Sequence, residues 1–243
     1  MFKKYQGKTY CFSPPVMLAT LVIEFSIAIY AIWRYKMNKI GKLIVIMLCA
    51  LGTFQLSEYL LCGGMGLSNV EWARIGYMAI TLLPPLGIHI IIETVGKKKP
   101  ILLGAAYASC VAFIGFYLFA SSSVTLLECM PNYAVFSAYP AIALPFSIYY
   151  FVWILAGIYL AVRWRNEMPK YKKPLQAMAI GYLAFVLPTA IVNIVYPSTI
   201  SGIPSIMCGF AVILAITAIK VLPSCCETRD SIQGLSDNTQ TAK

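Results

Sequence analysis

Seven apolar runs of about 20 residues each, separated by polar or turn-rich segments, constrain this chain more than any other feature. They cover residues 14–33, 43–62, 72–95, 101–120, 142–162, 175–195 and 204–222. An apolar helix of about 20 residues is long enough to cross the roughly 30 Å hydrocarbon core of a bilayer. Only 12% of the residues are charged, against about 25% in soluble domains. We therefore predict an all-α integral membrane protein, a seven-transmembrane-helix bundle over residues 14–222.

Basic residues lie mainly in alternate connections between the runs, which predicts an orientation. Twelve follow the first, third and fifth runs: Arg34, Lys36, Lys39, Lys42, Lys97, Lys98, Lys99, Arg163, Arg165, Lys170, Lys172 and Lys173. They outnumber Lys3, Lys4 and Lys8 at the N-terminus. Because Lys and Arg concentrate in cytoplasmic loops, we expect residues 1–13 to be extracellular. The polar tail 223–243 is then a disordered cytoplasmic segment of a multi-pass plasma membrane protein.

The net charge of +10 follows from this loop pattern and suits anionic lipid headgroups. It gives no support to nucleic acid as a partner, so the bilayer is the expected partner.

Ionisable side chains inside the runs are costly in hydrocarbon and are therefore candidates for function. Glu24 lies midway along the first run, where a carboxyl group is protonated, paired or in contact with water. Glu58 lies near the outer end of the second run, and Arg74 begins the third run on the same side. The short turn between these runs brings the two side chains together. We expect a Glu58–Arg74 ion pair, either as a rim contact that sets helix register or as part of a ligand site.

Other polar side chains near the outer end extend this candidate ligand-binding site. Gln55 shares a helical face with Glu58, and Tyr77, Trp72 and Asn193 lie at similar depth. These residues would line an outward-facing polar pocket. Hydrogen bonds between helices use the same residue types without any ligand, and the sequence leaves both interpretations open.

The segment ITLLPPLGIHIII, residues 80–92, carries the strongest helix breakers of the chain and its single histidine. Pro84 and Pro85 have no N–H to donate, so the third helix loses two consecutive hydrogen bonds and should bend. His89 lies farther toward the cytoplasmic side, and Glu93 follows one turn later on the same face. A bent helix joining an outer polar cluster to an inner titratable pair is typical of a hinge or switch. A static kink that serves packing alone is the alternative.

Eight cysteines divide by their predicted depth. Cys49, Cys110 and Cys208 fall within runs, as small core residues do. Cys11, Cys62 and Cys129 lie at or near the outer side, where an oxidising compartment would allow one disulfide among the three.

Several classes of active site do not fit the sequence. One histidine cannot supply the three protein ligands of a catalytic zinc site. Lys220 lies at the end of the last run rather than in its interior, which argues against a retinal Schiff base. We expect neither an enzyme nor a bound metal or cofactor.

Two segments resemble a known family. Residues 57–98, SEYLLCGGMGLSNVEWARIGYMAITLLPPLGIHIIIETVGKK, and residues 171–197, YKKPLQAMAIGYLAFVLPTAIVNIVYP, resemble the N-terminal seven-transmembrane region of bacterial sensor histidine kinases. The matching residues are Trp72, Ala73, Arg74, Pro84, Gly96, Lys97, Gln176, Pro188 and Asn193. The resemblance implies a sensory module. No kinase domain follows the last run, so His89 is not a phosphoacceptor and the signal would pass to a partner protein.

These observations favour a receptor-like membrane sensor that binds a small ligand or responds to a membrane stimulus. Glu24, Glu58 and Arg74 would recognise the ligand, and Pro84, Pro85 and His89 would transmit the change. A small transporter or proton-coupled carrier using Glu24 and His89 is the first alternative. A membrane scaffold that binds another protein through small-residue helix faces is the second.

Overall fold

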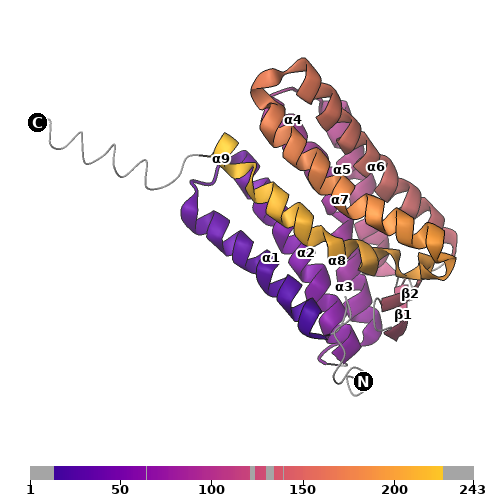
Figure 1. The fold of residues 1–243 in the computed structure, drawn as a ribbon. Helices are drawn as coiled ribbons and strands as arrows, with labels where there is room; N and C mark the ends of the chain where they lie inside the picture. Colours follow the sequence, from indigo (N-terminus) through magenta and orange to yellow (C-terminus); the bar gives the residue numbers. More distant parts are fainter. Residues whose placement is uncertain (1–13, 64, 121–123, 130–133, 139, 227–243) are drawn as a thin grey trace, which may run out of the picture.

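The computed structural model describes residues 14–63, 65–120, 124–129, 134–138 and 140–226, which form a bundle of helices (Figure 1). Seven helical spans in this part of the chain are long and apolar enough to cross a membrane, as the sequence predicted. The spans are α1 (Pro14–Arg34), α2 (Lys39–Gly63), α3 (Asn69–Thr81) with α4 (Leu83–Val95), α5 (Pro100–Phe119), α6 (Pro140–Glu167), α7 (Lys172–Val195) and α8 (Ile203–Ile219). The part of the chain that the structure describes also contains the short helices η2 (Pro169–Tyr171), η3 (Pro197–Gly202) and α9 (Leu222–Cys225).

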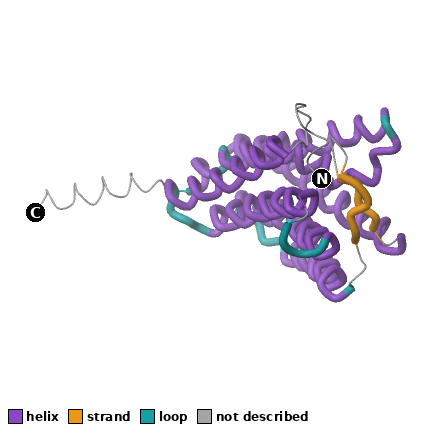
Figure 2. The backbone as a smooth tube through the Cα atoms, turned by 90° about the horizontal axis from the view of Figure 1, so that it is seen from below, coloured by secondary structure: helices purple, strands orange, loops and turns teal. Residues whose placement is uncertain are grey.

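The long connection after α5 forms a β-hairpin. Strands β1 (Val124–Cys129) and β2 (Ala134–Ala138) pair antiparallel, with an irregularity between Leu126 and Glu128. Figure 2 shows the hairpin at one end of the bundle. Val124 of β1 and Phe136 of β2 are buried. The hairpin therefore covers the helix ends as part of the core.

The two ends of the bundle differ in chemistry. We call the end with the β-hairpin and the start of α3 the hairpin end. The opposite end, where α2 begins at Lys39 and α6 ends at Glu167, is the basic end. The basic end carries the Lys and Arg residues on which the predicted orientation depends, and which side of a membrane it faces stays a prediction.

A disulfide between Cys62 and Cys129 joins the last turn of α2 to β1. It is one of the pairings that the sequence left open, and Cys11 lies outside the described residues. The link fastens the hairpin to the second span.

The third span lies at the centre of the bundle. In its most apolar stretch 78% of the residues are buried, against 17% in the corresponding stretch of α5. Large apolar side chains that remain exposed, such as Ile101 and Leu144, suit contact with lipid tails. The third span therefore has protein neighbours on most of its surface, and any change in its shape must be accommodated by other helices.

The third span is broken at Leu82. Ser68 and Glu71 form a capping box that starts α3, and the helix ends at Thr81, just before the Pro84–Pro85 pair. The interruption lies next to the two prolines, as the loss of backbone donors predicts, and the bend itself stays a prediction. The Thr81 carbonyl accepts a 2.7 Å hydrogen bond from the Tyr149 hydroxyl of α6. The Cys110 thiol of α5 lies 3.5 Å from the same oxygen, so neighbouring helices supply donors in place of the missing backbone N–H groups.

Gly87 allows α7 to approach α4 directly after the break. A Cβ atom built on Gly87 would lie 1.2 Å from the Tyr182 hydroxyl oxygen. Tyr182 is itself buried. The absence of a side chain at this position is therefore required for the packing of the two helices.

Gly87→Ala should destabilise the bundle by about 1–3 kcal/mol, the usual cost of overpacking a core. Gly104→Ala is the matched control, because a Cβ atom there meets nothing within 4 Å and alanine favours the helix. Unfolding of both variants in mixed detergent and denaturant micelles measures the difference. Equal stability of the two variants would contradict the close α4–α7 contact.

Candidate functional site

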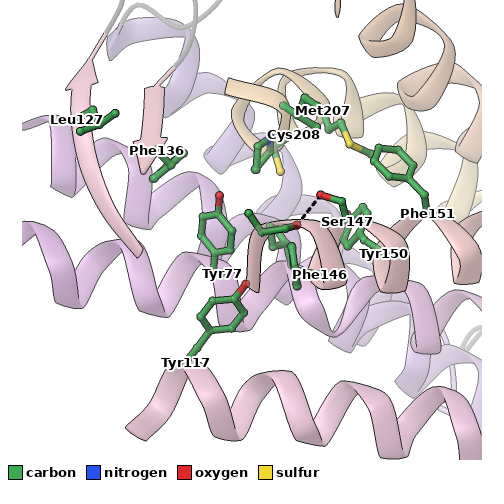
Figure 3. Close-up of a pocket in the computed structure, with 14 residues that line it drawn as sticks. Tyr77, Tyr117, Leu127, Phe136, Phe146, Ser147, Tyr150, Phe151, Met207 and Cys208 are labelled. Carbon is green, nitrogen blue, oxygen red and sulfur yellow. Dashed lines mark hydrogen bonds between the residues drawn. The ribbon is translucent and has the colours of Figure 1, made fainter. Parts of the chain in front are cut away.

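A cavity of about 330 Å³ lies near the hairpin end, bounded by α3, α5, α6, α8 and both strands (Figure 3). Its lining residues are Tyr77, Ile80, Tyr117, Leu127, Phe136, Ala143, Phe146, Ser147, Tyr150, Phe151, Ile203, Pro204, Met207 and Cys208. Leu127 and Ser147 are exposed on the bundle surface, so the cavity reaches the surface beside them. Its size is at the lower end of the range for small-molecule pockets, and such pockets are mostly apolar with few polar groups.

Aromatic rings from four elements form much of the cavity wall. The Tyr77 ring centroid lies 5.4 Å from that of Tyr117, 5.5 Å from Phe136 and 5.6 Å from Phe146. Phe146 also packs against Tyr150, at 5.8 Å. These distances are typical of interacting aromatic pairs. The contacts hold the wall in place without any ligand.

Two tyrosine hydroxyls give the cavity a polar side. In Figure 3, Tyr77 and Tyr117 both turn their hydroxyls toward the side on which Cys208 lies. Tyr117 is fully buried, and its hydroxyl has no hydrogen-bond partner within the described residues. A buried hydroxyl without a partner costs free energy. On this polar side of the cavity, the Tyr117 hydroxyl is therefore an unused donor and acceptor.

Glu58 lies behind this polar side. It is 1% exposed, and neither of its carboxyl oxygens has a hydrogen-bond partner in the described part of the chain. Tyr77 and Cys208, which line the cavity, both lie close to Glu58. The Ser205 hydroxyl is also close enough to interact with Glu58, although the pair does not meet hydrogen-bond geometry.

Glu24 and Gln55 add two more buried polar groups to the same region. Glu24 is 0% exposed and Gln55 is 1% exposed, and both lack a hydrogen-bond partner among the described residues. Cys208 lies close to Glu24 as well as to Glu58. The structure therefore brings together Glu24, Gln55, Glu58 and Tyr77 of the predicted ligand-binding set, where α1, α2, α3 and α8 meet.

Arg74 does not belong to this cluster, and the predicted Glu58–Arg74 ion pair is wrong. The Arg74 guanidinium instead donates to the backbone carbonyls of Tyr117, at 2.6 Å, and Leu118. These carbonyls end α5 and have no intrahelical partner, and a cation there also interacts favourably with the helix dipole. Arg74 therefore caps α5 and leaves Glu58 without a countercharge among the described residues.

Asn193 and Trp72 also lie apart from the cavity. Asn193 donates to the Thr189 carbonyl and accepts from the Thr199 hydroxyl, both at 2.8 Å. The Trp72 indole donates to the Met65 carbonyl at 2.8 Å. These bonds stabilise the end of α7 and the α2–α3 turn, so the expected polar pocket does not include the two residues.

The predicted His89–Glu93 pair is present on α4 toward the basic end. The His89 Nε2 atom lies 3.5 Å from Glu93 Oε1, and its Nδ1 lies 2.9 Å from the Tyr107 hydroxyl. Lys39 of α2 contacts the same Glu93 oxygen at 2.5 Å. The pair thus joins α2, α4 and α5, and no hydrogen-bonded chain of described side chains links it to Glu24.

Sequence reasoning missed the cavity walls supplied by α6, α8 and the hairpin. Phe146, Tyr149 and Tyr150 lie close together in the fifth run, but aromatic residues near span ends are also typical of the membrane interface. A turn of consecutive aromatics beside Pro145, within a span, was the available signal.

No protein-family model matches the chain, and comparison with curated proteins finds no match. The resemblance to sensor histidine kinases therefore stays an expectation from the sequence segments quoted above.

A double-mutant cycle tests the reassignment of Arg74. We expect Arg74→Gln to destabilise the protein by about 1.5–3 kcal/mol, because it removes hydrogen bonds from a charged donor. The effect should be the same in wild-type and Glu58→Gln backgrounds, within about 0.5 kcal/mol. Unfolding free energies of the four proteins give the coupling. A coupling above 1 kcal/mol would show that Arg74 and Glu58 interact, and would contradict the assignment of Arg74 to the end of α5.

Proposed function

We propose that this chain is a seven-helix membrane receptor module that binds a small, largely apolar molecule in the aromatic cavity. Ligand pockets are typically apolar with a few placed polar groups. This cavity combines rings on several sides with the Tyr117 hydroxyl and the nearby Glu58 carboxyl. A lone structural void would be expected to be lined by apolar groups throughout.

One observation carries the proposal: a single turn of α6 contacts both the cavity and the break. Phe146 and Tyr150 line the cavity, and Tyr149 between them binds the Thr81 carbonyl. Tyr77 and Ile80, on the other side of the break from Pro84, also line the cavity. A ligand that moves this turn of α6 would therefore change the angle between α3 and α4.

In this proposal, the end of the third span at the basic end of the bundle passes the signal to a partner protein. Glu93 contacts Lys39, and Lys97, just after α4, lies 3.4 Å from Glu167 of α6. Movement of α4 would rearrange these exposed ion pairs, which a partner protein at the basic end would read. This sequence of events agrees with the sensory role that the family resemblance implies.

Filling the cavity should abolish binding. The probe is (5,5-dimethylhexyl)benzene, a neutral phenylalkane, added to the full chain in phosphatidylcholine nanodiscs. We expect saturable binding above the level in empty discs, and a loss of at least tenfold in affinity for Ala143→Trp, whose side chain would occupy the cavity. Ala108→Trp is the matched control, because Ala108 is exposed on α5 and does not line the cavity.

Binding is measured by equilibrium dialysis, with the rise in unfolding temperature as a second readout, since a ligand of the folded state stabilises it. Equal binding to wild type, Ala143→Trp and empty discs would contradict the proposed function.

A further inference from the structure

The polar side of the cavity contains more acceptor capacity than the fold uses. We define the polar corner as the side formed by Tyr77, Tyr117 and Cys208. The buried Tyr117 hydroxyl has no partner there within the described residues. Behind the corner lie Glu58 and Glu24, whose four carboxyl oxygens are all without a described hydrogen-bond partner.

Nothing in the described part of the chain supplies a countercharge to these carboxyl groups. Among the described residues, Arg74 is the only Lys or Arg at the hairpin end, and its guanidinium is bound to the end of α5. The ion pairs that Lys39, Lys97 and Arg163 form lie at the basic end. Carboxylates within a membrane span normally pair with another group or mark a binding pathway.

The cavity walls favour an organic cation over a metal ion. Metal cations such as Ca²⁺ and Mg²⁺ require several oxygen ligands, often carboxylates, and the side-chain oxygens of the lining residues are the Tyr77, Tyr117, Tyr150 and Ser147 hydroxyls. Ser147 already donates to the Ala143 carbonyl at 2.8 Å. Tyrosine and phenylalanine rings, by contrast, attract an ammonium group through their faces, most strongly when the group carries little water.

We propose that the cavity binds an organic ammonium compound with an apolar tail. Its cationic head lies at the polar corner, where Glu58 acts through the Tyr77–Cys208 wall, and its tail extends toward the opening beside Leu127 and Ser147. This inference rests on the proposed function, since it names the chemical class of the ligand. A cation bound in the cavity favours the ionised form of Glu58, and few solvent molecules screen charges in the buried site.

A pair of probes of the same shape isolates the contribution of the charge. 4-Phenylbutyltrimethylammonium and (5,5-dimethylhexyl)benzene differ only in a quaternary nitrogen that replaces a quaternary carbon. Affinities are measured for the full chain in phosphatidylcholine nanodiscs. Because both probes partition into lipid, each affinity is calculated from the probe concentration in the lipid, which is measured with empty discs. We expect the ammonium probe to bind at least tenfold more tightly than the neutral probe.

Glu58→Gln should remove this preference and leave the neutral probe unaffected, because the amide keeps the size of the side chain and cannot ionise when the cation binds. Glu167→Gln is the matched control: it removes one negative charge at the basic end, where Glu167 contacts Arg163 and Lys97. The control should retain the preference of the wild type.

The outcomes separate the two proposals. Binding of both probes with equal affinity would overturn the ammonium inference while leaving the proposed receptor site in place. Failure of both probes to bind wild type would overturn both. If Glu58→Gln keeps the full preference while Ala143→Trp abolishes binding, the charge does not come from Glu58 and the inference fails. Should Glu58→Gln not fold, the wild-type ratio of the two affinities decides alone.

Discussion

A hydrogen bond from Tyr149 to the Thr81 carbonyl connects the broken third span to α6, and much of the arrangement depends on it. Pro84 and Pro85 remove backbone donors in the middle of a helix that lies at the centre of the bundle. A carbonyl left without a donor in hydrocarbon costs several kcal/mol, so a neighbouring helix must provide one. Tyr149 does so from the same turn that presents Phe146 and Tyr150 to the cavity. The break and the cavity therefore share one structural support.

The contrast between satisfied and unsatisfied polar groups identifies the candidate site. Backbone carbonyls exposed by the break or by the end of α5 are bound by Tyr149 and Arg74. The carboxyl groups of Glu24 and Glu58 have no such partner within the described residues. In a fold that provides donors for difficult backbone positions, each remaining buried polar group needs its own explanation. A ligand that completes the cluster gives that explanation for the hydroxyl and carboxyl groups together.

Features with a local physical cause were predictable from the sequence. The seven spans follow from the length of the apolar runs, and the break at Leu82 follows from two adjacent prolines. The His89–Glu93 contact follows from their spacing on one helical face. The partner of Arg74 was not predictable in the same way, because its long side chain reaches either the Glu58 carboxyl or the end of α5. The β-hairpin and the cavity depend on contacts between distant segments, which periodicity along one segment does not reveal.

The central claim is that occupancy of the cavity changes the angle of the third span at Leu82. Distances between spin labels at Asn69 and Lys98, which are exposed on either side of the break, test it most directly. Labels carried by an unnatural amino acid avoid the native cysteines, and the distances are measured in nanodiscs with and without saturating phenylalkane. The account predicts a shift of the distance distribution with probe, and a broader distribution without probe in Tyr149→Phe. An unchanged distribution at confirmed saturation would contradict it.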